Sequence, residues 1–361
     1  MANRHLTRGI FFLAFLAFFF CSGCAESADS GSPLQMLIQE VLRSPEAEGN
    51  PLPKVIDRIN FPEEYPEFAF DPEDDLLEIW FPSVRDQDAA IFLYQGQVWM
   101  LDCGDERAQT DTVPLLKHLG ISHIDKLINT HPHHDHLNGL YSIDAAVHVR
   151  ELLVCFPDDS TVHMVAAMEY CKGNGIRISS FEDETCLKMG DGFVSFLSWM
   201  KVDEAENMND RSAQFMVRYG NCSFLTMADI ELRGQKQLLE ALDPELLKAD
   251  ILRYPHHGKQ HMILELYQAI SPALVIITNT PRILECKDST RFLDYRHASV
   301  AYTCRGNTIL HLTTNGQQWL CEEYDFDPAP YLPSGSDSEN PETETGSGSP
   351  SSGFPASLPD T

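Results

Sequence analysis

Three apolar segments of the chain end in histidine or aspartate, and this pattern constrains the fold more than any other feature of the sequence. "DKLINT" (125–130) runs into "HPHHDH" (131–136), "SFLTMAD" (223–229) ends at Asp229, and "DILRYPHH" (250–257) ends at His256 and His257. Short apolar runs bounded by turn residues are typical of buried strands. Ligand sites in open α/β sheets lie beyond the carboxyl ends of strands. We therefore expect these residues to meet at one edge of a sheet.

The segment 76–326 has the pattern of a globular α/β domain. Strands are predicted at 76–81, 89–94, 97–102, 272–279 and 308–314, helices at 113–121 and 232–243, and a hairpin over 213–229 that turns at Gly220 and Asn221. Strands come first and are then interleaved with helices, which predicts an α/β sandwich.

The first 24 residues resemble an export signal. Arg4 and Arg8 precede an apolar run of 12 residues (10–21), whereas a membrane-spanning helix needs about 20 residues. The following "CSGC" resembles a bacterial lipobox, with Cys24 as the lipidated residue. We expect a bacterial lipoprotein, exported and held at the outer face of a membrane by its N-terminal lipid.

Two polar segments flank the predicted domain. Residues 25–75 read as a spacer with an acidic, proline-rich arm, and residues 327–361 as a disordered acidic tail. The formal net charge is −28 and the isoelectric point is about 4.7. Such a surface repels phosphate backbones, so composition disfavours long nucleic acid as a partner.

The ligand-bearing segments resemble the metallo-β-lactamase superfamily. "THPHHDHLNGL" is similar to its HxHxDH motif, "FLTMADIE" to the segment with the bridging aspartate, and "ILRYPHHG" to the PHHG subgroup. That subgroup includes ComEC-type hydrolase domains and phosphorylcholine esterases. "VWMLDCG" and "NDRS" resemble two further segments of these proteins. The resemblance covers about residues 76–318 and implies a four-layer αββα sandwich with two metal ions.

The resemblance also implies roles for individual residues. His131 and His133 would bind the first ion, while Asp135, His136 and either His256 or His257 would bind the second. Asp229 would bridge the ions, with Asp102 and Asn209 behind the ligands. Asp135, Asp229 and His257 would carry the catalysis. Imidazole and carboxylate ligands suit zinc, with manganese or iron as alternatives.

The chain departs from the subgroup pattern at positions that would surround the substrate rather than bind the metal ions. Ala228 stands where glycine is usual, Lys259 stands where serine is usual, and a late histidine segment is missing. The sequence predicts a metal-dependent hydrolase of small or cell-wall-linked phosphodiesters. The alternatives are a ComEC-like surface nuclease and a non-catalytic lipoprotein that keeps its metal ions.

Overall fold

A computed structural model describes residues 54–200, 207–283 and 298–333. The predicted signal, the lipidation site Cys24, most of the spacer and the tail from residue 334 lie outside the described residues. In the part of the chain that is described, no helix is long and apolar enough to cross a membrane.

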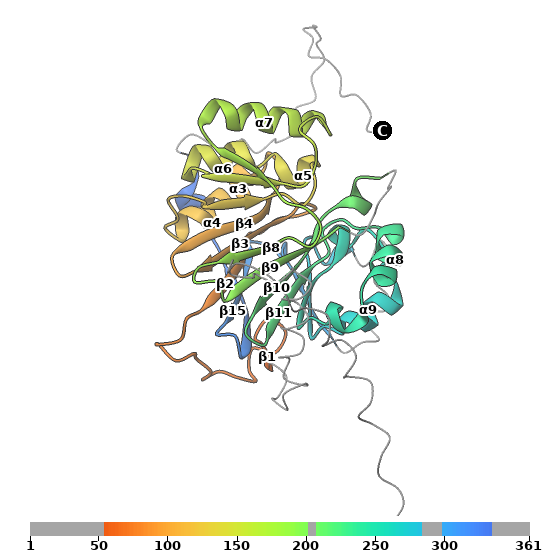
Figure 1. The fold of residues 1–361 in the computed structure, drawn as a ribbon. Coiled ribbons are helices and arrows are strands. Elements are labelled where there is room, and N and C mark those ends of the chain that lie inside the picture. The colour runs from red at the N-terminus through yellow and green to blue at the C-terminus, as the bar shows by residue number, and fades with distance from the viewer. Residues whose placement is uncertain (1–53, 201–206, 284–297, 334–361) are drawn as a thin grey trace, which may run out of the picture.

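Two β-sheets form the centre of the fold (Figure 1). The order of the first sheet is β1-β16-β15-β2-β3-β4-β5-β6-β7, with β1 at Lys54–Asp57, β2 at Leu77–Phe81, β3 at Ala89–Tyr94, β4 at Gln97–Cys103, β5 at Lys126–Ile128, β6 at Glu151–Val154, β7 at Arg177–Ser180, β15 at Thr308–Thr314 and β16 at Gln318–Asp325. The order of the second is β14-β13-β12-β11-β10-β9-β8, with β8 at Cys186–Met189, β9 at Val194–Trp199, β10 at Gln214–Tyr219, β11 at Cys222–Thr226, β12 at Ile251–Arg253, β13 at Leu274–Ile277 and β14 at Ser299–Tyr302.

Helices cover the outer face of each sheet. The first sheet carries α3 (Ala108–Asp111), α4 (Val113–His118), α5 (His134–Leu137), α6 (Leu140–Val147) and α7 (Val162–Asn174), and the second carries α8 (Leu232–Ala241) and α9 (Leu264–Ile270) (Figure 1). Side chains of both sheets, among them Phe92, Phe196 and Phe224, pack into one apolar layer between them. This arrangement confirms the predicted αββα sandwich, because each sheet buries one face on the other sheet and one on helices.

The predicted strands and helices inside 76–326 are confirmed, and two elements lie beyond those bounds. β1, inside the expected spacer, pairs in parallel with β16. Ala329–Tyr331, inside the expected tail, forms a short 3-10 helix, and the Tyr331 hydroxyl hydrogen-bonds His118 of α4 at 2.8 Å. The folded unit therefore includes residues on both sides of 76–326.

Strand direction brings the ligand-bearing segments together. β4, β5 and β6 are mutually parallel, and so are β11, β12 and β13. The carboxyl ends of parallel strands share one edge of their sheet, and the segments after β5, β11 and β12 carry the candidate ligands.

Candidate metal centre

The histidine-rich segment joins β5 to α5 and is anchored on both sides. Thr161 caps α7 by accepting a hydrogen bond from Met164 N, and its hydroxyl donates to the Pro132 carbonyl at 3.1 Å. At the other end, the Cys103 thiol approaches the His136 and Leu137 carbonyls at 3.4 and 3.2 Å. These contacts fix the histidine-rich segment against the ends of the strands.

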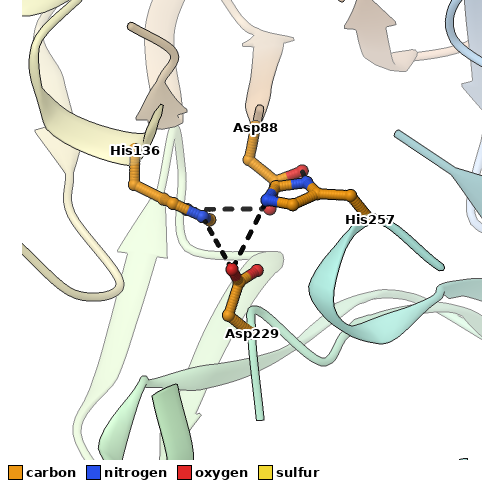
Figure 2. A group of neighbouring side chains, drawn as sticks. All are labelled: Asp88, His136, Asp229 and His257. Carbon is orange, nitrogen blue, oxygen red and sulfur yellow. Dashed lines mark ion pairs between the residues drawn. The ribbon is translucent and has the colours of Figure 1, made fainter. Parts of the chain in front are cut away.

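Four imidazoles converge on one oxygen of Asp229. The Nε2 atoms of His136, His257, His256 and His131 lie 3.3, 3.4, 3.7 and 3.9 Å from Asp229 Oδ2. Figure 2 shows the Asp229 carboxylate between the rings of His136 and His257. One carboxylate oxygen thus lies within 3.9 Å of four ring nitrogens.

The other candidate ligands fall into two groups around Asp229. His131 Nε2 and His133 Nδ1 lie 3.0 Å apart on one side. On the other side, Asp135 Oδ2 lies 3.3 Å from His257 Nε2. The structure thus brings together all seven residues that the sequence indicated as ligands.

The geometry separates His256 from His257, a choice that the sequence left open. The His257 ring is fully buried, and its Nδ1 hydrogen-bonds the Thr278 hydroxyl at 2.9 Å while Nε2 faces Asp135 and Asp229. His256 is partly exposed, and its Nδ1 lies 3.5 Å from Glu231. The arrangement therefore groups His257 with Asp135 and His136, and leaves His256 at the rim.

Backbone strain accompanies these ligands. His256 and His257 have φ values of 49° and 51°, and Ala228, just before Asp229, has a φ of 46°. Residues with a Cβ rarely adopt this left-handed region, and the strain costs about 1 kcal/mol or more each. The φ of Ala228 gives a physical reason for glycine at this place in the family pattern.

Ser212, rather than Asn209, contacts Asp229 directly. The Ser212 hydroxyl accepts a hydrogen bond from the Asp229 amide at 3.2 Å and donates to the Asn209 carbonyl at 2.7 Å. The Asn209 side chain donates to Glu231 at 3.0 Å. Asn209 is therefore linked to Asp229 through Ser212, and to His256 through Glu231.

Asp102 contacts His136 at the ring nitrogen that does not face Asp229. One of its oxygens lies 2.8 Å from His136 Nδ1, and its carboxylate also accepts hydrogen bonds from the amide and hydroxyl of Thr130 at 2.8 and 2.7 Å. A carboxylate that fixes the second nitrogen of an imidazole sets the tautomer and the orientation of the ring.

Replacing Asp102 by asparagine is expected to weaken metal binding by about 10- to 100-fold, the range for loss of a supporting partner. Asparagine tolerates the positive φ of 55° at this position. Titration of the metal-free variant with zinc in competition with a chelator measures the change. An unchanged affinity would show that Asp102 only anchors Thr130.

The pKa values of the histidines and of Asp229 at the centre depend on burial and on one another's charge. Burial lowers the pKa of His131 well below its usual value. Burial also disfavours the ionised form of Asp229, but the neighbouring His257 and His136 outweigh this and lower its pKa well below the usual range. For His136, burial is outweighed by Asp229, Asp102 and Asp135, which raise its pKa. The surroundings of Asp229 therefore favour its ionised form, which is the form in which a carboxylate binds a metal ion.

The sequence pattern did not indicate Asp88, Arg253 or Glu231 as residues of the site. Arg253 is buried in β12 and contacts the Asp88 carboxylate directly. An arginine inside a buried apolar strand is rarely without a partner, so Arg253 within the apolar run 250–255 could have indicated a buried ion pair. Lys259, which stands where serine is usual in the subgroup, pairs with Asp86 at 2.5 Å.

The residues present fit bound divalent cations. His136 Nε2, His257 Nε2 and Asp229 Oδ1 are buried and have no hydrogen-bond partner among the described residues. Buried polar atoms normally have a partner, and an unpaired one costs free energy. Imidazole nitrogens and carboxylate oxygens directed at one point are the donors that zinc, iron and manganese take.

Comparison with known proteins supports the superfamily. Residues 85–154, which include the HxHxDH segment, match the family model described as the metallo-beta-lactamase superfamily. No curated protein sequence matches the chain significantly. The match and the two-sheet topology together define a metallo-β-lactamase fold with a candidate metal site.

Solved structures similar to the chain share little sequence with it. They include a CmlA β-hydroxylase E377D mutant (TM-score 0.42, 14% identity, 68% of this chain and 54% of that one). A diphosphatase from the PhnP family matches with a TM-score of 0.35 and 12% identity, over 56% of this chain and 85% of that one. The metallo-β-lactamase fold protein YhfI from Bacillus subtilis matches with a TM-score of 0.39 and 11% identity, over 63% of this chain and 96% of that one. The chain spans about half the length of the CmlA protein.

Proposed function

We propose that the protein is an extracytoplasmic, membrane-tethered hydrolase that uses two divalent metal ions to cleave phosphodiesters. The convergence of four imidazoles on Asp229 Oδ2, with Asp135 beside them, carries the proposal. It is the donor arrangement that a two-ion hydrolase needs. The zinc assignment rests on the ligand types.

The preference for small or cell-wall-linked phosphodiesters rests on charge and on resemblance. A chain with a formal net charge of −28 repels a long polyanion, but a single phosphodiester brings only one negative charge. The "PHHG" segment resembles a subgroup that includes phosphorylcholine esterases. A ComEC-like nuclease would need a basic path to the centre, and Lys259 at the rim is already paired with Asp86.

The protein's own residues define how a substrate approaches. His131, His136 and His257 are buried and close the inner side of the centre, whereas His133, Asp135 and His256 retain some exposure. A substrate therefore enters on the side of these last three residues. When bound, two divalent ions supply Lewis-acid activation of water and of a phosphoryl oxygen. Asp102 and Thr278 hold His136 and His257 in place during that chemistry.

Hydrolysis of bis(p-nitrophenyl) phosphate by the purified protein tests the activity. We expect turnover that depends on added zinc or manganese and is lost in Asp135→Ala. Plasmid DNA, a p-nitrophenyl carboxyl ester and a chromogenic β-lactam are assayed in parallel. Turnover of the carboxyl ester alone would replace the phosphodiester proposal, and bound metal without any turnover would indicate the non-catalytic alternative.

Membrane attachment is tested separately, in a bacterial expression host. The apolar run at 10–21 and Cys24 support lipidation. Labelled palmitate is expected to be incorporated into the wild-type protein and not into Cys24→Ser. Equal labelling of both proteins, or release of both into the periplasm, would contradict the lipoprotein assignment.

A further inference from the structure

The four-residue cluster at the centre contains a carboxylate whose role is ambiguous from proximity alone. Asp88, His136, Asp229 and His257 each offer a ligand-type atom within 4.8 Å of those of the others (Figure 2). On that basis Asp88 is as good a candidate ligand as Asp229. The atoms that face one another distinguish the two aspartates.

Asp88 faces the outer nitrogens of the two imidazoles. Its oxygens lie 3.5 Å from His257 Nδ1 and 3.7 Å from His136 Nδ1. By contrast, Asp229 Oδ2 lies 3.4 and 3.3 Å from the Nε2 atoms of the same two rings. An imidazole that binds a metal through Nε2 presents Nδ1 to a supporting group behind it. The position of Asp88 is that of a supporting group.

Arg253 forms an ion pair with the Asp88 carboxylate inside the protein. Its guanidinium contacts Asp88 Oδ2 directly, hydrogen-bonds the Ala228 carbonyl, and lies 3.4 Å from the Thr278 hydroxyl. It also lies 3.6 Å from Asp229 Oδ1. Thr278 in turn bonds His257 Nδ1, and Ala228 precedes Asp229. One buried cation therefore touches the supports of both His257 and Asp229.

Arg253 and Asp88 are both buried, so water cannot solvate either charge if the ion pair is broken. Arg253 is 2% exposed and Asp88 is 6% exposed. Both line a cavity of about 10 Å³ beneath the centre, together with Asp102, and that volume holds about one water molecule. A buried charge without a partner is strongly unfavourable, so each of the two groups requires the other.

The main chain of Asp88 is fixed at the same place. Its amide donates to the Asp135 carbonyl at 3.1 Å, and its carbonyl accepts from the Gly104 amide at 2.7 Å. The Asp88 main chain is therefore held between the end of β4 and α5, the helix that carries the predicted ligand Asp135.

We propose that Asp88 is not a metal ligand and that Asp88 and Arg253 form a buried ion pair which positions His136, His257 and Asp229 from behind. The pair lies behind the two rings, beside their hydrogen-bond partners Asp102 and Thr278, and its guanidinium balances the buried Asp88 carboxylate. Asp88 and Arg253 are thus positioning residues. The inference refines the metal centre of the proposed function.

A double-mutant cycle with Asp88→Asn and Arg253→Met tests the pair. Zinc affinity is measured by competition with a chelator, and melting temperature is measured on the metal-free proteins. We expect each single variant to bind zinc about 10- to 100-fold more weakly. The double variant is expected to bind within a few-fold of the single ones, because the second change removes a partner already lost. Its metal-free melting temperature should exceed that of Arg253→Met, which leaves the Asp88 carboxylate buried and unpaired.

Cobalt substitution separates positioning from coordination. The visible absorption of bound Co²⁺ reports the ligand set, and we expect Asp88→Asn at saturating cobalt to keep both the wild-type spectrum and the wild-type number of bound ions. Loss of one ion, or a changed band pattern in Asp88→Asn but not in Arg253→Met, would show that Asp88 is a ligand and would overturn the proposal. Additive losses of zinc affinity in the double variant would overturn it as well.

A partly buried arginine–carboxylate pair away from the centre serves as the control. Arg58 pairs with Glu322 at 2.9 Å on β16 and also bonds the Tyr65 and Phe68 carbonyls. Arg58→Met is expected to lower the melting temperature while leaving zinc affinity and the cobalt spectrum unchanged. All readouts are metal binding and melting, so failure of the phosphodiesterase assay does not affect their interpretation.

Discussion

Replacing Gly139 by alanine is expected to destabilise the protein by about 3 kcal/mol or more. A Cβ at this position would lie 1.8 Å from the Cys103 carbonyl oxygen and 2.9 Å from the Ala108 side chain. The Gly139 amide also bonds the Gly104 carbonyl at 2.9 Å, which joins the end of β4 to the start of α6. The clash is with backbone, so it is relieved only by moving α5 and His136 away from β4. Urea unfolding of the metal-free protein measures the loss.

Gly173→Ala is the matched control for this substitution. Gly173 lies in α7, and an added Cβ there meets no atom within 4 Å. Alanine is favoured over glycine inside helices by up to about 1 kcal/mol. We therefore expect Gly173→Ala to leave stability unchanged or slightly raised. If Gly139→Ala unfolds at the same urea concentration as the wild type, the close approach of α6 to β4 is wrong.

Replacing Asp229 by asparagine is expected to have the largest effect on activity. An amide offers one neutral oxygen where the carboxylate faces four imidazole nitrogens. Two-metal sites contribute several kcal/mol to catalysis, so loss of the bridge is expected to reduce hydrolysis of the activated phosphodiester by at least about 1000-fold. Bound zinc, measured by elemental analysis after gel filtration, should fall below the wild-type content.

The control for Asp229→Asn is Asp243→Asn at an exposed position. Asp243 caps the short helix Pro244–Leu247 by accepting from the Glu245 amide at 3.0 Å, and asparagine caps helices about as well. We expect wild-type zinc content and turnover in this variant. Retention of both zinc and activity in Asp229→Asn would reject Asp229 as the bridging residue.

The sequence by itself determined the parts of the fold that depend on local pattern. Apolar runs such as 89–94 and 97–102 predicted strands that are present as β3 and β4. The signal for a buried strand is the apolar run itself, so it can be read from the local sequence alone. The spacing within HPHHDH and the ends of two further strands indicated seven candidate ligands, which the structure brings together. The signal and lipidation site lie outside the described residues and stay predictions.

Only the tertiary structure decided features that join distant segments. The pairing of β1 with β16 was not predicted, because an edge strand of four residues in a polar segment leaves little local signal. The choice between His256 and His257 depended on Thr278 and Glu231, which come from other segments. The partnership of Asp88 with Arg253 links the residue just before β3 in one sheet to β12 in the other. A sequence shows which residues are able to bind a metal, but the direction in which each ring nitrogen points is set by backbone conformation and by partners far away in the chain.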